Sequence, residues 1–318
     1  MAKALDSGAE IKRVAARVSN WGRWGDEDEL GTINLLTPDR IAGAARSVRK
    51  GKVFALAIPF DGSGPQMGEV AGRFNPVHSM LATGTDALSK PHGPNGFGYA
   101  DDMITMPLQC ATQWDGLSHV FHEGRMYNGF GADLVSSGGA TRNGIEKMTG
   151  RLVGRGVLLD VPRYLGGEAS SPGHAITGRE LEIMAEREKV EIQPGDMLLV
   201  RTGWMAPFLV RKSWNGYADG DCPGLSYSTA EWLHEKDIAA IATDTYRVEV
   251  KPTDLKGARS PLHILALVYM GMLLGEIFNL EELANDCASD SVYEMLLVAA
   301  PLPFTGAVGS PINPYAIK

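Results

Sequence analysis

Apolar runs and amphipathic stretches alternate along the second half of the chain. Because a strand covered on both faces carries few polar side chains, nearly continuous apolar runs predict buried strands. Such runs lie at 156–161, 197–202 and 238–244. Amphipathic stretches predict helices at 177–188 and 229–235, and Thr177 and Glu180 have the spacing of a capping box. Strands that alternate with helices indicate an α/β fold.

The first half of the chain departs from this alternation. Thr37 and Pro38 predict the N-cap and first residue of a helix that runs to about residue 49. A strand is predicted at 53–58, followed by a glycine- and proline-rich excursion over 59–98, a length that predicts a functional or disordered loop. No linker divides the sequence. We therefore expect one domain over residues 1–318, with an N-terminal extension of about 1–36.

The segment 106–122 holds the densest group of reactive side chains. Gln109, Gln113 and Asp115 recur at a period of two, so on a strand they share one face. A glycine then allows a turn, after which His119 and His122 can return toward that face. Carboxylate, amide and imidazole groups that converge can hold a divalent cation or carry out acid–base chemistry.

Two other interpretations of this segment stay open. Ser118 lies beside His119 and near Asp115, which raises a serine nucleophile, but the neighbouring residues do not form a nucleophile elbow. A buried histidine is also more often a hydrogen-bonded core residue than a ligand. The presence of Asp115, His119 and His122 within eight residues favours a functional site.

Two polar residues stand in apolar surroundings farther along the chain. His263 follows Pro261, which suits the first turn of a helix, and Glu276 lies in an apolar run. A carboxylate among apolar side chains is costly unless it is paired or bound to a metal. Thirteen residues separate the two, so on one straight helix they would point roughly 140° apart. They can converge only if the helix stops near Gly271 or Gly275.

Composition excludes several classes of protein. The net charge of −8 argues against a general affinity for nucleic acid or for an anionic membrane. No uninterrupted apolar run is long enough to span a bilayer, and the first ten residues lack the apolar core of a signal peptide, so we expect a cytoplasmic protein. Three scattered cysteines without a Cys-x-x-Cys pair make a disulfide framework and a cysteine zinc site unfavourable interpretations.

The chain resembles the cyclase family of metal-dependent hydrolases, which includes bacterial kynurenine formamidase and isatin hydrolase. The family motif is His-x-Gly-Thr-His-x-Asp-x-Pro-x-His, and the matching stretch runs from Gln109 to His119. Asp115 and His119 keep their motif identities, while Gln109 and Gln113 replace two histidines and Leu117 replaces the proline. A later family histidine and glutamate match His263 and Glu276. The resemblance implies a swivelling β/α/β domain with a mixed sheet.

The resemblance also implies a reaction: a metal-activated water attacks the carbonyl of an amide, a lactam or a lactone. The implied cofactor is Mn²⁺ or Zn²⁺, and amide oxygens in place of imidazoles favour the harder ion. The candidate metal ligands are Gln113, Asp115, His119, His263 and Glu276. The candidate catalytic residues are His119, His122 and Glu276, and the candidate substrate contacts are Phe74, His78 and Trp114.

Two alternative functions accompany this hypothesis. One is a metal-free hydrolase or lyase that uses His119 as base and Asp115 to orient it. The other is a non-enzymatic protein that binds a small molecule on a decayed hydrolase scaffold; the four retained site residues disfavour it. Family behaviour and the apolar segment around Trp21 and Trp24 predict a homodimer or homotetramer whose ligand is a small molecule.

Overall fold

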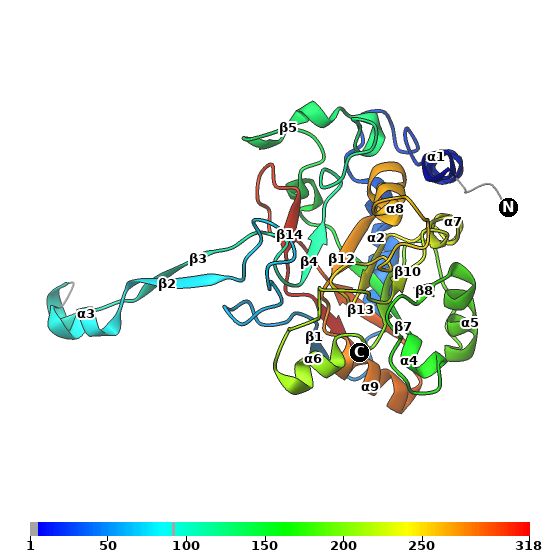
Figure 1. Ribbon diagram of the computed structural model, residues 1–318. Helices are drawn as coiled ribbons and strands as arrows, with labels where there is room; N and C mark the ends of the chain where they lie inside the picture. Colours follow the sequence, from blue (N-terminus) through cyan, green and yellow to red (C-terminus); the bar gives the residue numbers. More distant parts are fainter. Residues whose placement is uncertain (1–5, 91–92) are drawn as a thin grey trace.

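A mixed sheet forms the centre of the structure, a computed structural model that describes residues 6–90 and 93–318 (Figure 1). Within these residues the sheet has nine strands. In spatial order they are β1 (Val53–Ala55), β15 (Tyr315–Ile317), β13 (Glu294–Val298), β7 (Val153–Asp160), β9 (Met197–Arg201), β11 (Ala240–Thr243), β12 (Leu273–Glu276), β4 (Gln113–Asp115) and β14 (Gly309–Pro311).

The middle of this sheet is parallel and its two sides are antiparallel. Strands β7, β9, β11 and β12 pair in parallel, whereas β13, β15 and β1 on one side and β4 and β14 on the other pair antiparallel. Leu158, Leu199 and Ile241 on the parallel strands are fully buried, as their unbroken apolar runs predicted. The expected α/β fold with a mixed sheet is therefore confirmed.

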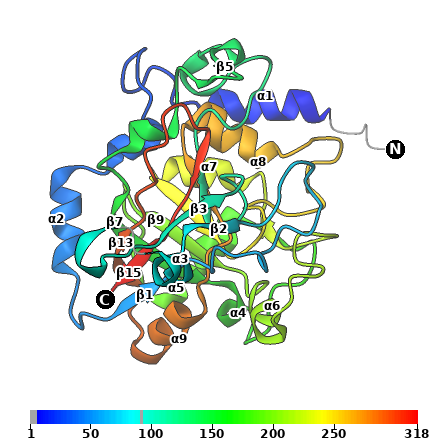
Figure 2. The same ribbon diagram turned by 90° about the vertical axis from the view of Figure 1, so that its left-hand side faces the viewer.

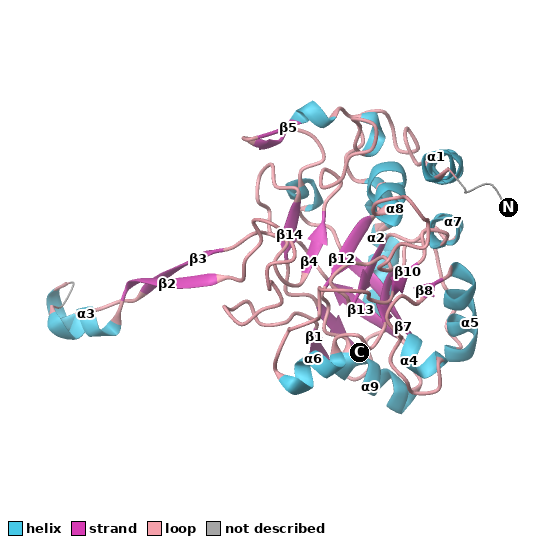
Figure 3. Cartoon of the chain, in the orientation of Figure 1, coloured by secondary structure: helices cyan, strands magenta, loops and turns pink. Residues whose placement is uncertain are grey.

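Helices surround the sheet, as Figure 3 shows. They are α1 (Ser7–Val18), α2 (Pro38–Arg46), α3 (Gly84–Ser89), α4 (Val161–Tyr164), α5 (Gly178–Glu188), α6 (Ala206–Arg211), α7 (Thr229–Glu235), α8 (Pro261–His263) and α9 (Glu281–Asp290). Helix α2 packs against β7 and β13, and α5 packs against α7 and β7. None of the helices in the described residues combines the length and apolarity that crossing a bilayer requires.

The predicted helix starts have the expected chemistry. The Thr37 side chain accepts a hydrogen bond from the Arg40 amide, with Pro38 in the first turn, and Thr177 and Glu180 form a reciprocal capping box. Two predicted elements are too long. Helix α2 ends at Arg46 rather than near residue 49, and β1 ends at Ala55 rather than at residue 58.

Short helices and small strand pairs fill the connections. The 3-10 helices are η1 (Gly31–Leu35), η2 (Pro94–Gly96), η3 (Tyr127–Gly129), η4 (Ala132–Leu134) and η5 (Ile145–Met148), and η6 (Ile264–Met270) is a π-helix. Three further strand pairs are β2 (Val77–Ala82) with β3 (Asp101–Thr105), β5 (Val135–Ser136) with β6 (Gly139–Ala140), and β8 (Ala175–Ile176) with β10 (Gly224–Leu225).

The excursion predicted as a loop contains regular structure. Strands β2 and β3 form an antiparallel ribbon with α3 at its tip, and this arm projects away from the sheet (Figure 1). Figure 2 looks along the arm, with α3 in front of the body. We call the described residues 77–90 and 93–105 the arm. Nearly every described side chain on its two strands is exposed.

The N-terminal segment lies against the C-terminal half of the chain. Helix α1 packs on α7 and η6. Trp21 donates its indole N–H to the Val268 carbonyl oxygen at 2.7 Å and stacks on Tyr269. Part of the apolar surface of this segment is therefore buried against the same chain.

Candidate functional site

Strands β4 and β12 bring the two halves of the predicted site side by side. In their antiparallel register Gln113 lies opposite Glu276, and Asp115 lies opposite Leu274. Paired residues of antiparallel strands share a face, so Gln113, Asp115 and Glu276 all point the same way. The strand predicted over 109–115 is shorter than expected, because only Gln113–Asp115 pairs in the sheet.

The chain reverses direction between His263 and Glu276, and this brings the two side chains together as predicted. Helix α8 continues into η6, which ends at Met270, and Gly271 has a positive φ of 67°. A Cβ at residue 271 would also lie 2.4 Å from the Tyr127 ring, so the position needs glycine for space as well as for conformation. Strand β12 then starts at Leu273 and returns Glu276 to His263.

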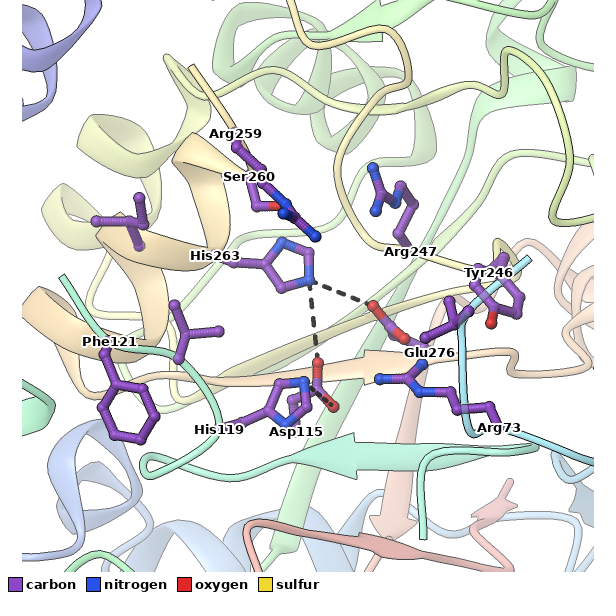
Figure 4. Close-up of a pocket in the computed structure, with 13 residues that line it drawn as sticks. Arg73, Asp115, His119, Phe121, Tyr246, Arg247, Arg259, Ser260, His263 and Glu276 are labelled. Atoms are coloured by element: carbon purple, nitrogen blue, oxygen red, sulfur yellow. Dashed lines mark hydrogen bonds and ion pairs between the residues drawn. The ribbon is translucent and has the colours of Figure 1, made fainter. Parts of the chain in front are cut away.

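Asp115, His263 and Glu276 form a compact cluster (Figure 4), with one candidate ligand atom from each lying within 4.8 Å of the others. His263 Nε2 is 3.3 Å from Glu276 Oε1 and 3.9 Å from Asp115 Oδ2. His119 joins from the other side, with Nε2 3.7 Å from Asp115 Oδ1. Two carboxylates and an imidazole at this spacing are a donor set suited to a divalent cation.

The cluster is buried, and its polar atoms are incompletely paired. Asp115, Glu276 and His263 are 1%, 4% and 7% exposed. Asp115 Oδ1 and Gln113 Oε1 have no hydrogen-bond partner among the described residues. Burial of an unpaired polar atom is costly, so a bound cation that these two oxygens coordinate would stabilise the cluster.

The charges of the cluster shift its proton equilibria. Burial raises the pKa of the Asp115 carboxyl, and Glu276 adds to this, although His119 and His263 oppose it. For His263, burial alone would lower the pKa, but the carboxylates of Glu249 and Glu276 outweigh it and raise the pKa to about 10. A ligand histidine must be neutral, so a cation would have to displace this proton.

Glu249 is a functional residue that the sequence interpretation missed. Its Oε1 lies 2.5 Å from His263 Nδ1, and its Oε2 accepts the Leu262 amide at 3.1 Å. A carboxylate that holds one ring nitrogen fixes the orientation of the other, a common arrangement behind metal-binding histidines. Glu249 stands between Val248 and Val250, so the signal that singled out Glu276 was also present here.

The cluster opens into a pocket of about 420 Å³. Its polar wall contains Asp115, His119, His263 and Glu276 together with Arg73, Arg247, Arg259 and Ser260, and its apolar wall contains Val70, Val120, Phe121, Tyr246 and Ile264. The volume lies within the range of sites for small molecules. The three arginines, like Glu249, were not among the predicted residues.

The two motif glutamines lie next to the pocket rather than in its wall. Gln113 is fully buried and donates its Nε2 to Glu276 Oε2 at 2.9 Å, so it holds that carboxylate from behind. The Nε2 of Gln109 has no partner among the described residues and lies close to Gly309. Ser118 donates its hydroxyl to the Asn143 carbonyl oxygen at 2.9 Å, which turns it away from nucleophilic chemistry.

Four predicted residues lie outside the pocket wall. His122 pairs with the Tyr269 hydroxyl at 2.8 Å, and Trp114 is fully buried with its indole N–H on the Ala299 carbonyl oxygen. His78 lies on the arm, 2.8 Å from Asp102, and Phe74 is exposed next to the pocket residue Arg73. The structure therefore gathers Asp115, His119, His263 and Glu276 and leaves these four apart.

The protein is an α/β protein with a mixed sheet. It carries a buried carboxylate–imidazole cluster beside the parallel strand β12. A family model described as "Putative cyclase" matches residues 54–250. A solved structure described as a novel cyclase is 39% identical, with 96% of this chain and 99% of that chain covered and a TM-score of 0.85. The chain belongs to the cyclase family.

More distant structures share the fold. Isatin hydrolase A from Labrenzia aggregata, bound to benzyl benzoate, is 19% identical over 87% of this chain and 96% of its own, with a TM-score of 0.60. A predicted metal-dependent hydrolase from Bacillus stearothermophilus is 16% identical over 83% of this chain and 97% of its own, with a TM-score of 0.52. A comparison with curated proteins found no match.

Proposed function

We propose that this protein is a metal-dependent hydrolase that cleaves an amide, a lactam or a lactone. The observation that carries the proposal is the convergence of Asp115, His263 and Glu276 at the floor of a pocket sized for a small molecule. Family membership and the fold shared with isatin hydrolase A support it. A divalent cation held there would lower the pKa of a water and polarise a carbonyl group.

The donor set agrees with Mn²⁺ or Zn²⁺. Asp115 and Glu276 supply hard carboxylate oxygens, and His263 supplies one nitrogen. Gln113 supports Glu276 through its amide N–H, and the unpaired Gln113 oxygen is a further neutral donor. Glu249 holds the far side of the His263 ring, so Nε2 stays directed at the two carboxylates.

His119 is the residue suited to moving a proton. Its side chain is 21% exposed at the pocket wall, whereas the Asp115 carboxylate beside it is almost fully buried. An imidazole that borders the pocket can accept a proton from the attacking water and return one to the leaving nitrogen or oxygen. Asp115, 3.7 Å away, stabilises the charge that the ring gains.

The same pair supports the metal-free alternative. If no cation is bound, His119 and Asp115 form a base and its orienting carboxylate, and the hydrogen bond between His263 and Glu276 closes the cluster. The two functions differ in one measurable quantity, which is the dependence of turnover on metal.

Metal analysis with a substrate panel tests the proposal. Protein purified without added ions is assayed for bound metals, then for hydrolysis of lactams, lactones and N-formyl compounds before and after chelation. Asp115→Asn should lose both metal and activity, because it removes a carboxylate from the cluster. Asp219→Asn, at an exposed carboxylate outside the pocket wall, is the matched control and should keep both. Activity that survives full chelation would favour the metal-free alternative.

A further inference from the structure

Three arginines from separate segments of the chain line one pocket. Arg73 lies in the excursion before the arm, Arg247 follows β11, and Arg259 precedes α8. We infer that they bind a carboxylate of the substrate, so that the compound hydrolysed is an organic acid. This inference rests on the proposed function, because it assigns the substrate class of the same site.

The part of the chain that the structure describes gives the side chains of these arginines no carboxylate partner. Among the described residues, no carboxylate oxygen lies within the 4.0 Å ion-pair distance of Arg73, Arg247 or Arg259. Two structural arginines of the same chain, by contrast, form ion pairs with carboxylates. Arg155 pairs with Asp196 at 2.7 Å, and Arg201 pairs with Asp160 and Glu281, each at 2.8 Å. These two guanidinium groups are thus paired within the fold, whereas those of Arg73, Arg247 and Arg259 remain available to a ligand in the pocket.

Two of the three arginines are partly enclosed, whereas Arg259 is exposed. Arg73 and Arg247 are half-buried, and Arg73 interacts with the hydroxyl of Tyr246, which is itself fixed by a 3.0 Å hydrogen bond to Gln66. Figure 4 shows Arg73, Arg247 and Arg259 arranged around Glu276 and His263. A guanidinium held near its working position loses little conformational freedom when it binds an anion.

The overall charge of the chain makes this concentration of cations informative. The protein carries a net charge of −8, so a group of three arginines to which the described residues give no carboxylate partner runs against its average surface. A simpler explanation is that the arginines offset Asp115 and Glu276. However, these carboxylates already face His119 and His263, and a divalent cation would neutralise them further. The positive charge then remains for the substrate.

The opposite wall of the pocket indicates the other part of the substrate. Phe121, Val120 and Ile264 supply apolar surface, and Figure 4 draws Phe121 on the far side of the cluster from Arg73 and Arg247. A substrate that spans the pocket would place an apolar group by Phe121, its scissile carbonyl at the cluster, and its carboxylate at the arginines. Guanidinium groups favour carboxylates because two N–H groups match two oxygens.

Binding and turnover together test the inference. Small aromatic and aliphatic carboxylates, benzoate and succinate among them, are titrated by calorimetry at low salt into metal-free protein, each beside its neutral amide. Each hydrolysable compound of the panel is also assayed as its free acid and as its neutral carboxamide. We expect at least tenfold tighter binding and tenfold higher kcat/KM for the acids, about the effect of one charge-assisted hydrogen bond.

Variants locate the effect. Arg73→Met, Arg247→Met and Arg259→Met should each weaken carboxylate binding by fivefold or more and leave amide binding unchanged. Arg247→Lys keeps the charge and should fall between wild type and Arg247→Met. Lys256→Met removes an exposed charge from the same loop as Arg259 but outside the pocket wall, and it should change binding less than twofold.

The outcomes separate this inference from the proposed function. Equal binding of every acid and its amide, or acid binding that survives all three methionine variants, would overturn the inference. Hydrolysis of neutral compounds as fast as acids would do so while leaving the hydrolase in place. Conversely, arginine-dependent acid binding by a protein that takes up no metal when metal is supplied and hydrolyses no compound of the panel would support the anion site and remove the proposed function.

Discussion

Glu249 lies 2.5 Å from Nδ1 of His263, and the second ring nitrogen faces the cluster of Asp115 and Glu276. Because the Glu249 carboxylate accepts a hydrogen bond from Nδ1–H of the ring, Nε2 is left to face the pocket. The Leu262 amide holds the other oxygen of Glu249, so the ring and the start of α8 are fixed together. Glu249 is therefore a positioning residue for His263.

Glu249→Gln tests this role. The amide keeps the shape but loses the charge, so we expect metal affinity to fall about 10- to 100-fold. Metal dissociation constants and thermal unfolding are measured on the same preparation, with the exposed Glu235→Gln as control. A purely structural role would lower the unfolding temperature and leave the metal dissociation constant as it is in the wild type.

His119→Ala tests the proton-transfer step. Its loss should lower kcat by about 10²- to 10⁴-fold, the usual contribution of a general acid or base. Metal content should change much less, because the Asp115, His263 and Glu276 donors remain. Steady-state kinetics across pH with metal analysis give both quantities. Wild-type turnover in this variant would remove His119 from the mechanism.

Gln113→His restores the residue type found at this position in the family motif. The imidazole would lie beside Glu276, where the Gln113 amide now donates, and should shift metal preference from Mn²⁺ toward Zn²⁺. Gln109→His at the other substituted motif position is the comparison. Unchanged metal selectivity in Gln113→His would mean that residue 113 acts only by holding Glu276.

Local patterns predicted the part of the site that is encoded within single segments. Asp115 and His119 lie close together in the structure, as their spacing predicted. Gly271 follows the end of the helix, and this allows His263 to approach Glu276. The period of two that grouped Gln113 with Asp115 also places Trp114 on the opposite face. Trp114 accordingly packs on Phe278 in the core, so the pattern itself argued against a substrate contact.

The residues that were missed depend on tertiary structure. Arg73, Arg247 and Arg259 lie in irregular segments, and only the folded chain brings them to one pocket. The arm was equally hard to foresee, because its strands lack a buried face and so show no alternation of apolar and polar residues. His78 became a candidate through its residue type alone, and it lies on this arm.

Glu188 gives a prediction for the pH dependence of stability. Burial raises the pKa of this carboxyl from its usual 4.5 to about 8; Oε1 accepts the Asp160 amide at 3.0 Å, and Oε2 has no partner among the described residues. The folded state therefore keeps a proton that the unfolded state releases between pH 4.5 and 8. Stability should fall as pH rises through this window.

Glu188→Gln should remove that loss, because the amide is neutral at every pH in the window. We expect its unfolding temperature at pH 8 to exceed that of the wild type by about 2 °C or more, and to be closer to it at pH 5. The exposed neighbour Glu186→Gln is the control. Parallel pH profiles of wild type and Glu188→Gln would contradict a buried neutral carboxyl.

The arm gives a structural reason to expect an oligomer. Leu81 is 65% exposed and Leu88 is 89% exposed, and Val77 and Ile104 also face outward. A two-stranded ribbon without a covered face is marginally stable in water. We therefore predict that a second copy of this chain covers the arm, which by two-fold symmetry would cover both arms at once.

Light scattering at micromolar concentration checks this prediction. The expected mass is two or four times the 34.2 kDa of one chain. Leu81→Asp with Ile104→Asp should shift the protein to monomer, because buried charges at these positions would have no partner. Val210→Asp, at an exposed apolar position on α6, is the matched control and should leave the mass unchanged. A wild-type mass of 34.2 kDa would show that the arm stands uncovered, and the expected oligomer would then be wrong.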